Sequence, residues 1–232
     1  MRISVFIPCY NEEKYLDDCL TSLSKQTLLP DEVILCDNNS SDNSVLVANK
    51  YKKNLNLIVI NETKQGIMPT VEKAWRATTG DILIRTDADA VFPPQWIEKI
   101  IGHFNDDPKL AACGGDWVPY QENVFWKIVT KLGFELGNIV LPITKGYVYL
   151  FGPNTAIRRH IMKQINGYIT NDPHIIDDQL LSQKLYQNKL KFARFSDCWN
   201  YHSARRYHQG IAKLIRYAAS CIFPRLYLEK AS

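Results

Sequence analysis

Ile82-Leu83-Ile84-Arg85-Thr86-Asp87-Ala88-Asp89-Ala90 joins an apolar run to two aspartates that stand two residues apart. The run 82–84 predicts a short buried strand, and Asp87 and Asp89 fall where that strand ends. Residues i and i+2 of a strand share a face, so both carboxylates can reach one hard cation or one polyhydroxylated ligand. Open α/β sheets bind ligands at the carboxyl ends of their strands. A solvated acidic turn is the alternative that the triplet alone leaves open.

Short apolar runs alternate with segments of helical periodicity through residues 1–90. We predict strands at 3–8, 32–36, 57–60 and 82–86, and helices that begin at Asn11, about Ser41 and about Thr70, with Asn11 as an N-cap. This alternation predicts a doubly wound, mostly parallel sheet flanked by helices. Polar clusters at 8–12, 37–42 and 87–89 follow three of the strands and should converge on one edge. That convergence favours a binding site over a turn.

The second half has a less regular pattern. We predict helices at 95–104, 123–141 and 177–188, strands at 110–115 and 191–195, and a β segment at 147–157. No repeats or low-complexity linkers divide the chain, so we predict one domain with a nucleotide half and a smaller β/helical substrate half.

Composition excludes several classes of protein. The 232 residues are 46% hydrophobic and 22% charged, which fits a globular protein with a sizeable core. The net charge of +4 is not gathered in a basic tract, so we expect no nucleic-acid partner. The six scattered cysteines suit buried, reduced thiols. Without a signal peptide or membrane-spanning run in the sequence, we expect a cytoplasmic protein, free or attached to the inner face of the membrane.

Six segments, in this order, resemble motifs of glycosyltransferase family 2, which comprises inverting enzymes with a GT-A fold. They are Ile7-Pro8-Cys9-Tyr10-Asn11-Glu12, Asp37-Asn38-Asn39-Ser40-Ser41-Asp42-Asn43-Ser44, Asp87-Ala88-Asp89, Gly152-Pro153-Asn154-Thr155-Ala156-Ile157-Arg158-Arg159, Asp177-Asp178 and Ser203-Ala204-Arg205-Arg206. The resemblance covers most of the chain and is strongest over residues 3–100. It implies a Rossmann-like central sheet and transfer of a sugar from a nucleoside diphosphate.

The resemblance also implies site residues. Those implied to contact the nucleotide sugar are Pro8, Tyr10, Glu12, Asp37, Asn39, Asp87, Ala88, Arg205 and Arg206. Asp89 and Asp87 are the expected ligands of Mg²⁺ or Mn²⁺, with His202 either a third ligand or a structural histidine. Arg205 or Arg206 offers a fork of donors to the pyrophosphate. Asn154 and His174 are candidates for the acceptor site.

Inversion requires one base that takes the proton of the acceptor hydroxyl. Asp177 and Asp178 are adjacent, so their like charges should raise one of the two pKa values, although spacing does not say which carboxylate faces the site. The resemblance places the base second, at Asp178. Asn38-Asn39 stands where the family has Asp-Gly, so the donor nucleotide stays open among UDP, GDP and dTDP types.

We divide this single domain into a nucleotide-sugar-binding half (1–105), an acceptor and catalytic half (106–209) and a C-terminal amphipathic helix (210–232). Apolar residues of that last segment recur at helical spacing, from Ile211 to Phe223. We expect this stripe to pack on the core or on a second subunit; contact with a membrane that carries a lipid-linked acceptor is the alternative.

We therefore predict a metal-dependent, inverting glycosyltransferase that acts on a hydroxyl of a glycan, polysaccharide or lipid-linked acceptor. The first alternative is a nucleotidyltransferase that makes sugar nucleotides. It would require a glycine-rich phosphate loop after the first strand, where this chain has 8–11 instead. The second is an inactive carbohydrate-binding or scaffold protein of the same fold, against which the intact acidic residues and Arg205 argue.

Overall fold

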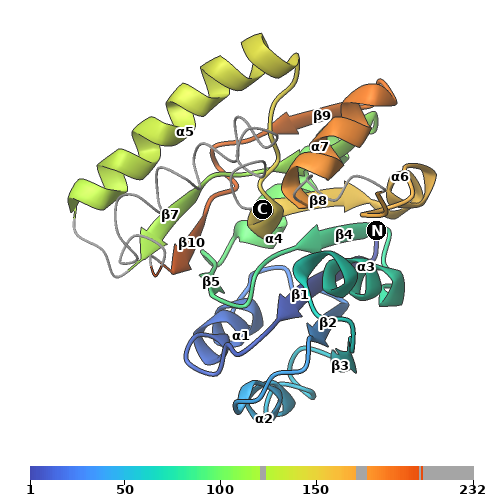
Figure 1. Cartoon of the computed structure of the whole chain (residues 1–232), viewed down its shortest axis with the longest axis vertical. Coiled ribbons are helices and arrows are strands. Elements are labelled where there is room, and N and C mark those ends of the chain that lie inside the picture. The colour runs from blue at the N-terminus through green and yellow to red at the C-terminus, as the bar shows by residue number, and fades with distance from the viewer. Residues whose placement is uncertain (121–123, 171–176, 204, 206–232) are drawn as a thin grey trace, which may run out of the picture.

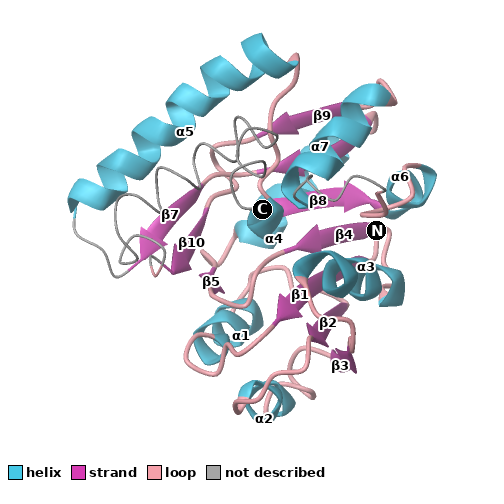
Figure 2. Ribbon diagram, viewed as in Figure 1, coloured by secondary structure: helices cyan, strands magenta, loops and turns pink. Residues whose placement is uncertain are grey.

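The computed structural model describes residues 1–120, 124–170, 177–203 and 205. A central sheet of seven strands dominates this part of the chain, in the order β3-β2-β1-β4-β8-β6-β9 (Figures 1 and 2). The strands are β1 (Ile3–Cys9), β2 (Glu32–Asp37), β3 (Leu57–Asn61), β4 (Ile82–Arg85), β6 (Leu110–Gly114), β8 (Thr155–Arg158) and β9 (Lys191–Arg194). The first four pair in parallel, and β8 runs antiparallel to both of its neighbours. The predicted sheet is thus confirmed.

Helices cover both faces of this sheet. The helices of the described residues are α1 (Leu16–Ser24), α2 (Ser44–Asn49), α3 (Ile67–Ala77), α4 (Trp96–Asp106), α5 (Val124–Lys145), α6 (Arg159–Gln164) and α7 (Asp177–Gln187). Among them, α5 has its main contacts with a strand outside this sheet. Val5 and Ile7 of β1 join the apolar core that includes α1 and α4, whereas Phe6 joins the core of α3, α6 and α7. Because alternate side chains enter two different cores, the central strands are apolar at nearly every position.

The parallel register brings the predicted polar clusters together. Cys9 pairs with Asp37, and Phe6 pairs with Arg85 and accepts a hydrogen bond from the Thr86 amide at 3.2 Å. The carboxyl ends of β1, β2 and β4 therefore lie side by side, and the residues after β4 continue along the end of β1. This is the convergence that the sequence predicts.

A second, three-stranded sheet is absent from the sequence prediction. Its order is β5-β10-β7, with β5 at Ala90–Val91, β10 at Asn200–Ser203 and β7 at Trp117–Tyr120. β5 has only two residues, and β10 mixes polar and aromatic side chains, so neither shows a strand pattern. Their antiparallel pairing sets His202 opposite Ala90, directly beside Asp89.

Two local predictions are wrong. The first helix begins at Leu16, because Asn11 adopts a left-handed backbone (φ 55°) and Glu12 starts a turn instead; Asn11 is not an N-cap. The segment 147–157 becomes a strand only at Thr155, after a 3₁₀ turn at Gly152–Asn154.

Five of the six cysteines are free and buried, as predicted: Cys9, Cys19, Cys36, Cys113 and Cys198. Cys221 and the predicted helix 210–232 lie outside the described residues. Within the described part of the chain, no helix combines the length and the apolar character that a membrane crossing requires.

Candidate active site

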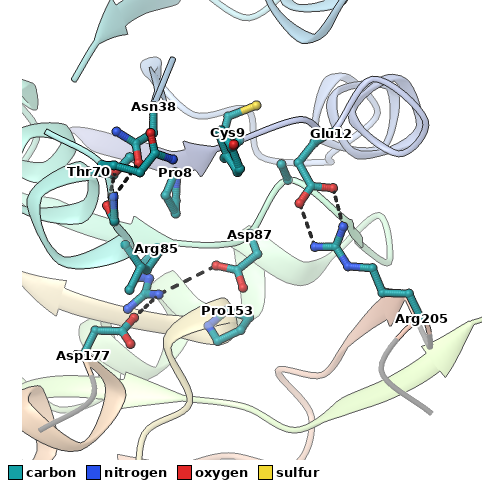
Figure 3. A pocket seen from close by; sticks show the side chains of 15 residues that line it. Pro8, Cys9, Glu12, Asn38, Thr70, Arg85, Asp87, Pro153, Asp177 and Arg205 are labelled. Atoms are coloured by element: carbon teal, nitrogen blue, oxygen red, sulfur yellow. Dashed lines mark hydrogen bonds and ion pairs between the residues drawn. The ribbon is translucent and has the colours of Figure 1, made fainter. Parts of the chain in front are cut away.

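A cavity of about 370 Å³ opens at the carboxyl ends of β1 and β4 (Figure 3). It is lined by Pro8, Cys9, Tyr10, Glu12, Asn38, Gln65, Gly66, Ile67, Thr70, Arg85, Asp87, Ala88, Pro153, Asp177 and Arg205. The wall combines residues from both halves of the chain. It brings together Pro8, Tyr10, Glu12, Asp87 and Ala88 from the predicted donor set with Asp177 at the start of α7.

Asp87, Asp89 and His202 form a compact acidic cluster beside this cavity. One ligand atom of each lies within 4.8 Å of the others, and Nδ1 of His202 stands 3.4 Å from Oδ1 of Asp89. Nε2 of His202 is buried and has no hydrogen-bond partner among the described residues. Two carboxylates suit Mn²⁺ or Mg²⁺, and an unpartnered buried imidazole nitrogen fits a further ligand position, for which Mn²⁺ is the better match of the two. The residues present therefore fit the cation that the sequence predicts.

Burial raises the pKa of Asp87, although the positive charge of Arg85 opposes this shift. Removing a carboxylate from water disfavours its charged form, and the nearby charge of Asp89 adds repulsion. A divalent cation would reverse both effects, because it stabilises the charged form of both carboxylates.

Arg205 bridges two acidic residues on one side of the cavity. Its guanidinium donates to both carboxylate oxygens of Glu12, at 2.8 and 2.6 Å, and lies 3.2 Å from Oδ2 of Asp89. Burial raises the pKa of Glu12, and the hydrogen bonds and charge of Arg205 oppose that shift. The arginine therefore holds a buried carboxylate next to the acidic cluster.

Arg85 joins two acidic groups on the opposite side of the cavity. Its guanidinium makes an ion pair with Asp177, and Nη2 lies 3.8 Å from Oδ1 of Asp87 (Figure 3). The side chain is only 3% exposed. The sequence prediction missed this residue, although a signal was present: a cation inside a buried strand requires an acidic partner.

Asn38, rather than its neighbours, reaches the cavity from the loop after β2. Its amide nitrogen donates to the carbonyls of Glu62 and Lys64 at 2.8 and 2.9 Å, and its oxygen accepts from the Gly66 amide at 2.8 Å. The side chain thereby fixes the segment that supplies Gln65, Gly66 and Ile67 to the wall. The predicted donor residues Asp37 and Asn39 do not line this cavity. Asp37 is buried, and Asn39 donates to the Thr63 carbonyl at 3.0 Å.

Replacing Asn38 with alanine is expected to lower the free energy of unfolding by about 2 kcal/mol, since three backbone groups lose a partner. The melting temperature should fall by roughly 4–8 °C. Calorimetry checks both values. Asn54→Ala, at an exposed position, is the control and should leave them unchanged. Equal melting temperatures for the two variants would contradict the role of Asn38.

Asn154, a residue predicted for the acceptor site, is buried and makes its hydrogen bonds within the protein. Its oxygen accepts from Nε1 of Trp96 at 3.0 Å, and its nitrogen donates to the carbonyls of Asp116 and Cys198 at 2.8 and 2.7 Å. It is 1% exposed. These contacts occupy the amide, so Asn154 ties α4 to the loops after β6 and β9 instead of facing the cavity.

Three predicted site residues remain: Asp178, His174 and Arg206. Asp178 is the second residue of α7, directly after Asp177. His174 and Arg206 lie outside the described residues.

The sheet order and the aspartate pair at its carboxyl edge define a GT-A fold. The family model of Glycosyl transferase family 2 matches residues 4–166. The chain belongs to this family, as its motifs predict.

Curated relatives are similar over most of the chain. The poly(ribitol-phosphate) beta-N-acetylglucosaminyltransferase TarS of Staphylococcus aureus is 24% identical over 216 residues, which cover 89% of this chain and 36% of TarS. The glucosyl-dolichyl phosphate glucuronosyltransferase of Haloferax volcanii is 25% identical over 184 residues, which cover 74% of this chain and 57% of that protein. The chain thus spans only part of the length of these relatives.

Solved structures share the fold. The mannosyltransferase PcManGT of Pyrobaculum calidifontis, in complex with GDP-Man and Mn²⁺, superposes with a TM-score of 0.71 at 20% identity, covering 93% of this chain and 61% of that one. S. aureus TarS 1-349, in complex with UDP-GlcNAc, has a TM-score of 0.67 at 21% identity, with 88% and 59% covered. These likenesses confirm the GT-A fold.

Proposed function

We propose that this protein is a divalent-cation-dependent, inverting glycosyltransferase, which transfers a sugar from a nucleoside diphosphate to a hydroxyl acceptor. The observation that carries the proposal is the cluster of Asp87, Asp89 and His202 beside a cavity whose wall includes Asp87 and Asp177. Relatives named as glycosyltransferases, and neighbours that bind UDP-GlcNAc or GDP-Man, support the same reading. The donor sugar is of the UDP, GDP or dTDP type.

Asp89, Asp87 and His202 would hold the cation, Mg²⁺ or Mn²⁺. When bound, it supplies positive charge against the pyrophosphate as the nucleoside diphosphate departs. Arg205 stands beside this cluster, and its two Nη atoms each donate to Glu12. A guanidinium has five N–H donors in one plane, so further donors remain for phosphate oxygens. We assign it to the pyrophosphate, with Glu12 holding the guanidinium in position.

The base is proposed to be Asp178. The carboxylate of its neighbour Asp177 is engaged by Arg85 in a buried ion pair, which keeps Asp177 in place rather than available for proton transfer. Asp178 would accept the proton of the acceptor hydroxyl while the hydroxyl oxygen attacks the anomeric carbon. The attack comes from the side opposite the departing nucleoside diphosphate. Residues 1–105 serve the donor and 106–209 the acceptor in this scheme.

We propose a hydroxyl acceptor on a glycan, a polysaccharide or a lipid-linked saccharide, and action in the cytoplasm or at the inner face of the membrane. The nucleotidyltransferase alternative is not favoured, because β1 ends in Pro8-Cys9 and no glycine-rich loop follows it. An inactive protein of this fold would show no hydrolysis of any nucleotide sugar.

Asp89→Asn is expected to weaken the binding of Mn²⁺ by about 10- to 100-fold or more, because it removes a proposed direct ligand. Mn²⁺ affinity of the unchanged protein should also fall as the pH drops through the raised pKa of Asp87, since protons then compete for the carboxylate. Titration calorimetry with MnCl₂ checks both effects. Asp106→Asn, exposed at the end of α4, is the matched control.

Donor hydrolysis across UDP-, GDP- and dTDP-sugars with Mn²⁺ then tests the activity itself. Cation binding without hydrolysis of any of these donors would favour the inactive alternative.

A further inference from the structure

One face of α5 carries a row of exposed aliphatic side chains. Their exposed fractions lie between 53% and 78%, whereas residues of this type are usually buried. The six residues are Val124, Ile128, Leu132, Leu136, Ile139 and Ile143. Spacings of three and four residues place them on one side of the helix. We call this row the α5 ridge; it runs nearly the full 22 residues of the helix, about 33 Å.

The fold itself uses the other side of the helix. α5 contacts β7, and Thr130, which is buried, lies opposite the ridge on the helical wheel. The helix forms an outer edge of the molecule beside β7 (Figure 1). The contacts of α5 with the described residues thus lie on the side that carries Thr130, and the ridge stays exposed.

Charge and shape indicate what covers the ridge. Lys127 and Lys131 are exposed along one border, and Glu135 lies 4.0 Å from Lys131. The six exposed side chains form one continuous row along a helix, unlike the single exposed apolar residues that are normal on a soluble protein. A stable dimer buries about 800 Å² on each partner, which six side chains in a single row do not supply by themselves. A lipid layer with anionic headgroups fits both the apolar ridge and the lysines along its border.

We propose that the α5 ridge docks on an anionic lipid surface. The aliphatic side chains enter the boundary between headgroups and acyl chains, and Lys127 and Lys131 face the lipid phosphates. The helix lies in the plane of the surface and does not cross it. β7, beneath α5, pairs with the strand that carries His202, so the docked face adjoins the side of the molecule that holds the cation cluster. The docking does not depend on the proposed transferase activity.

Flotation of the full chain with phosphatidylcholine vesicles, with and without phosphatidylglycerol, tests this proposal. We expect the protein to float with the anionic vesicles, and the double variant Leu132→Gln/Leu136→Gln to bind them at least about tenfold less. Lys127→Gln/Lys131→Gln should reduce the preference for anionic over neutral vesicles. Leu46→Gln is the matched control, since Leu46 is 64% exposed on α2. It should bind as the unchanged protein does.

Ile128→Gln/Ile139→Gln provides a second ridge variant, and melting temperatures verify that each variant folds. Donor hydrolysis should be equal in all of them, so loss of docking and failure of the proposed activity are separate results. The proposal is overturned if the unchanged protein stays in solution with anionic vesicles. It is also overturned if both ridge variants float normally, which would assign binding to another surface. A dimer that the ridge variants dissociate would make a second copy of the chain the partner.

Discussion

Asp178→Asn is expected to lower kcat for sugar transfer by about 10²- to 10⁴-fold, because the amide cannot accept the proton of the acceptor hydroxyl. The affinity for the nucleoside diphosphate should stay nearly unchanged, since the cation cluster and Arg205 come from other elements. Asparagine has nearly the same shape as aspartate, so the start of α7 is preserved. Steady-state kinetics measure the first effect and titration calorimetry with the nucleoside diphosphate and Mn²⁺ the second.

Asp177→Asn provides the comparison. It removes the acidic partner of Arg85, so its expected effect is a lower melting temperature together with lower activity. Asp178→Asn should lower activity alone. An Asp178→Asn protein that loses nucleotide binding and transfer equally would refute the assignment of the base.

Arg85→Met is expected to lower the free energy of unfolding by about 3 kcal/mol, since it leaves the carboxylates of Asp177 and Asp87 without their buried counter-charge. For a chain of this size the melting temperature should fall by roughly 6–12 °C. Methionine retains most of the side-chain volume, so the loss reports on charge more than on packing. Differential scanning calorimetry of the folded protein is the measurement.

The control for this change is Arg76→Met. Arg76 also pairs with a carboxylate, that of Glu72 on the same helix, but its side chain is 50% exposed. Water screens exposed ion pairs, so we expect Arg76→Met to change the free energy of unfolding by less than about 1 kcal/mol. The double variant Arg85→Met/Asp177→Asn should lose less free energy of unfolding than the two single variants together. The reason is that it leaves one buried charge fewer without a partner. Additive losses would show that the two side chains are not coupled.

The sequence predicts the strands of the nucleotide half within one or two residues, and the reason is local. Each of β1, β2 and β4 is a compact apolar run, and burial on both faces makes such a run stand out from the amphipathic helices. The small sheet is different. β5 has two residues and pairs with β10, and β10 (Asn200–Ser203) pairs with both β5 and β7, so partners far away in the sequence make these segments strands.

The residues of the site likewise divide into those whose place local spacing predicts and those whose place it does not. Asp87 follows the end of β4 in the chain and reaches the cavity wall, as the spacing predicts. Asn38 and Asn39 are adjacent and chemically identical, so spacing does not show which one faces the cavity. The left-handed backbone of Asn39 (φ 59°) and the hydrogen bonds of Asn38 to 62–66 decide this. Asn154 matches a motif by position, but its amide is taken up by packing.

The sequence by itself determined the parallel sheet, the edge at which the polar clusters meet, and the position of Asp87 and Asp89 at that edge. These features follow from the periodicity of neighbouring residues, which is written along the chain. Only the tertiary structure decided that Arg85 pairs with Asp177 and that His202 stands beside Asp89. Each of those pairs joins segments about ninety or more residues apart, and no local spacing encodes which distant strand or helix end will lie opposite a buried charge.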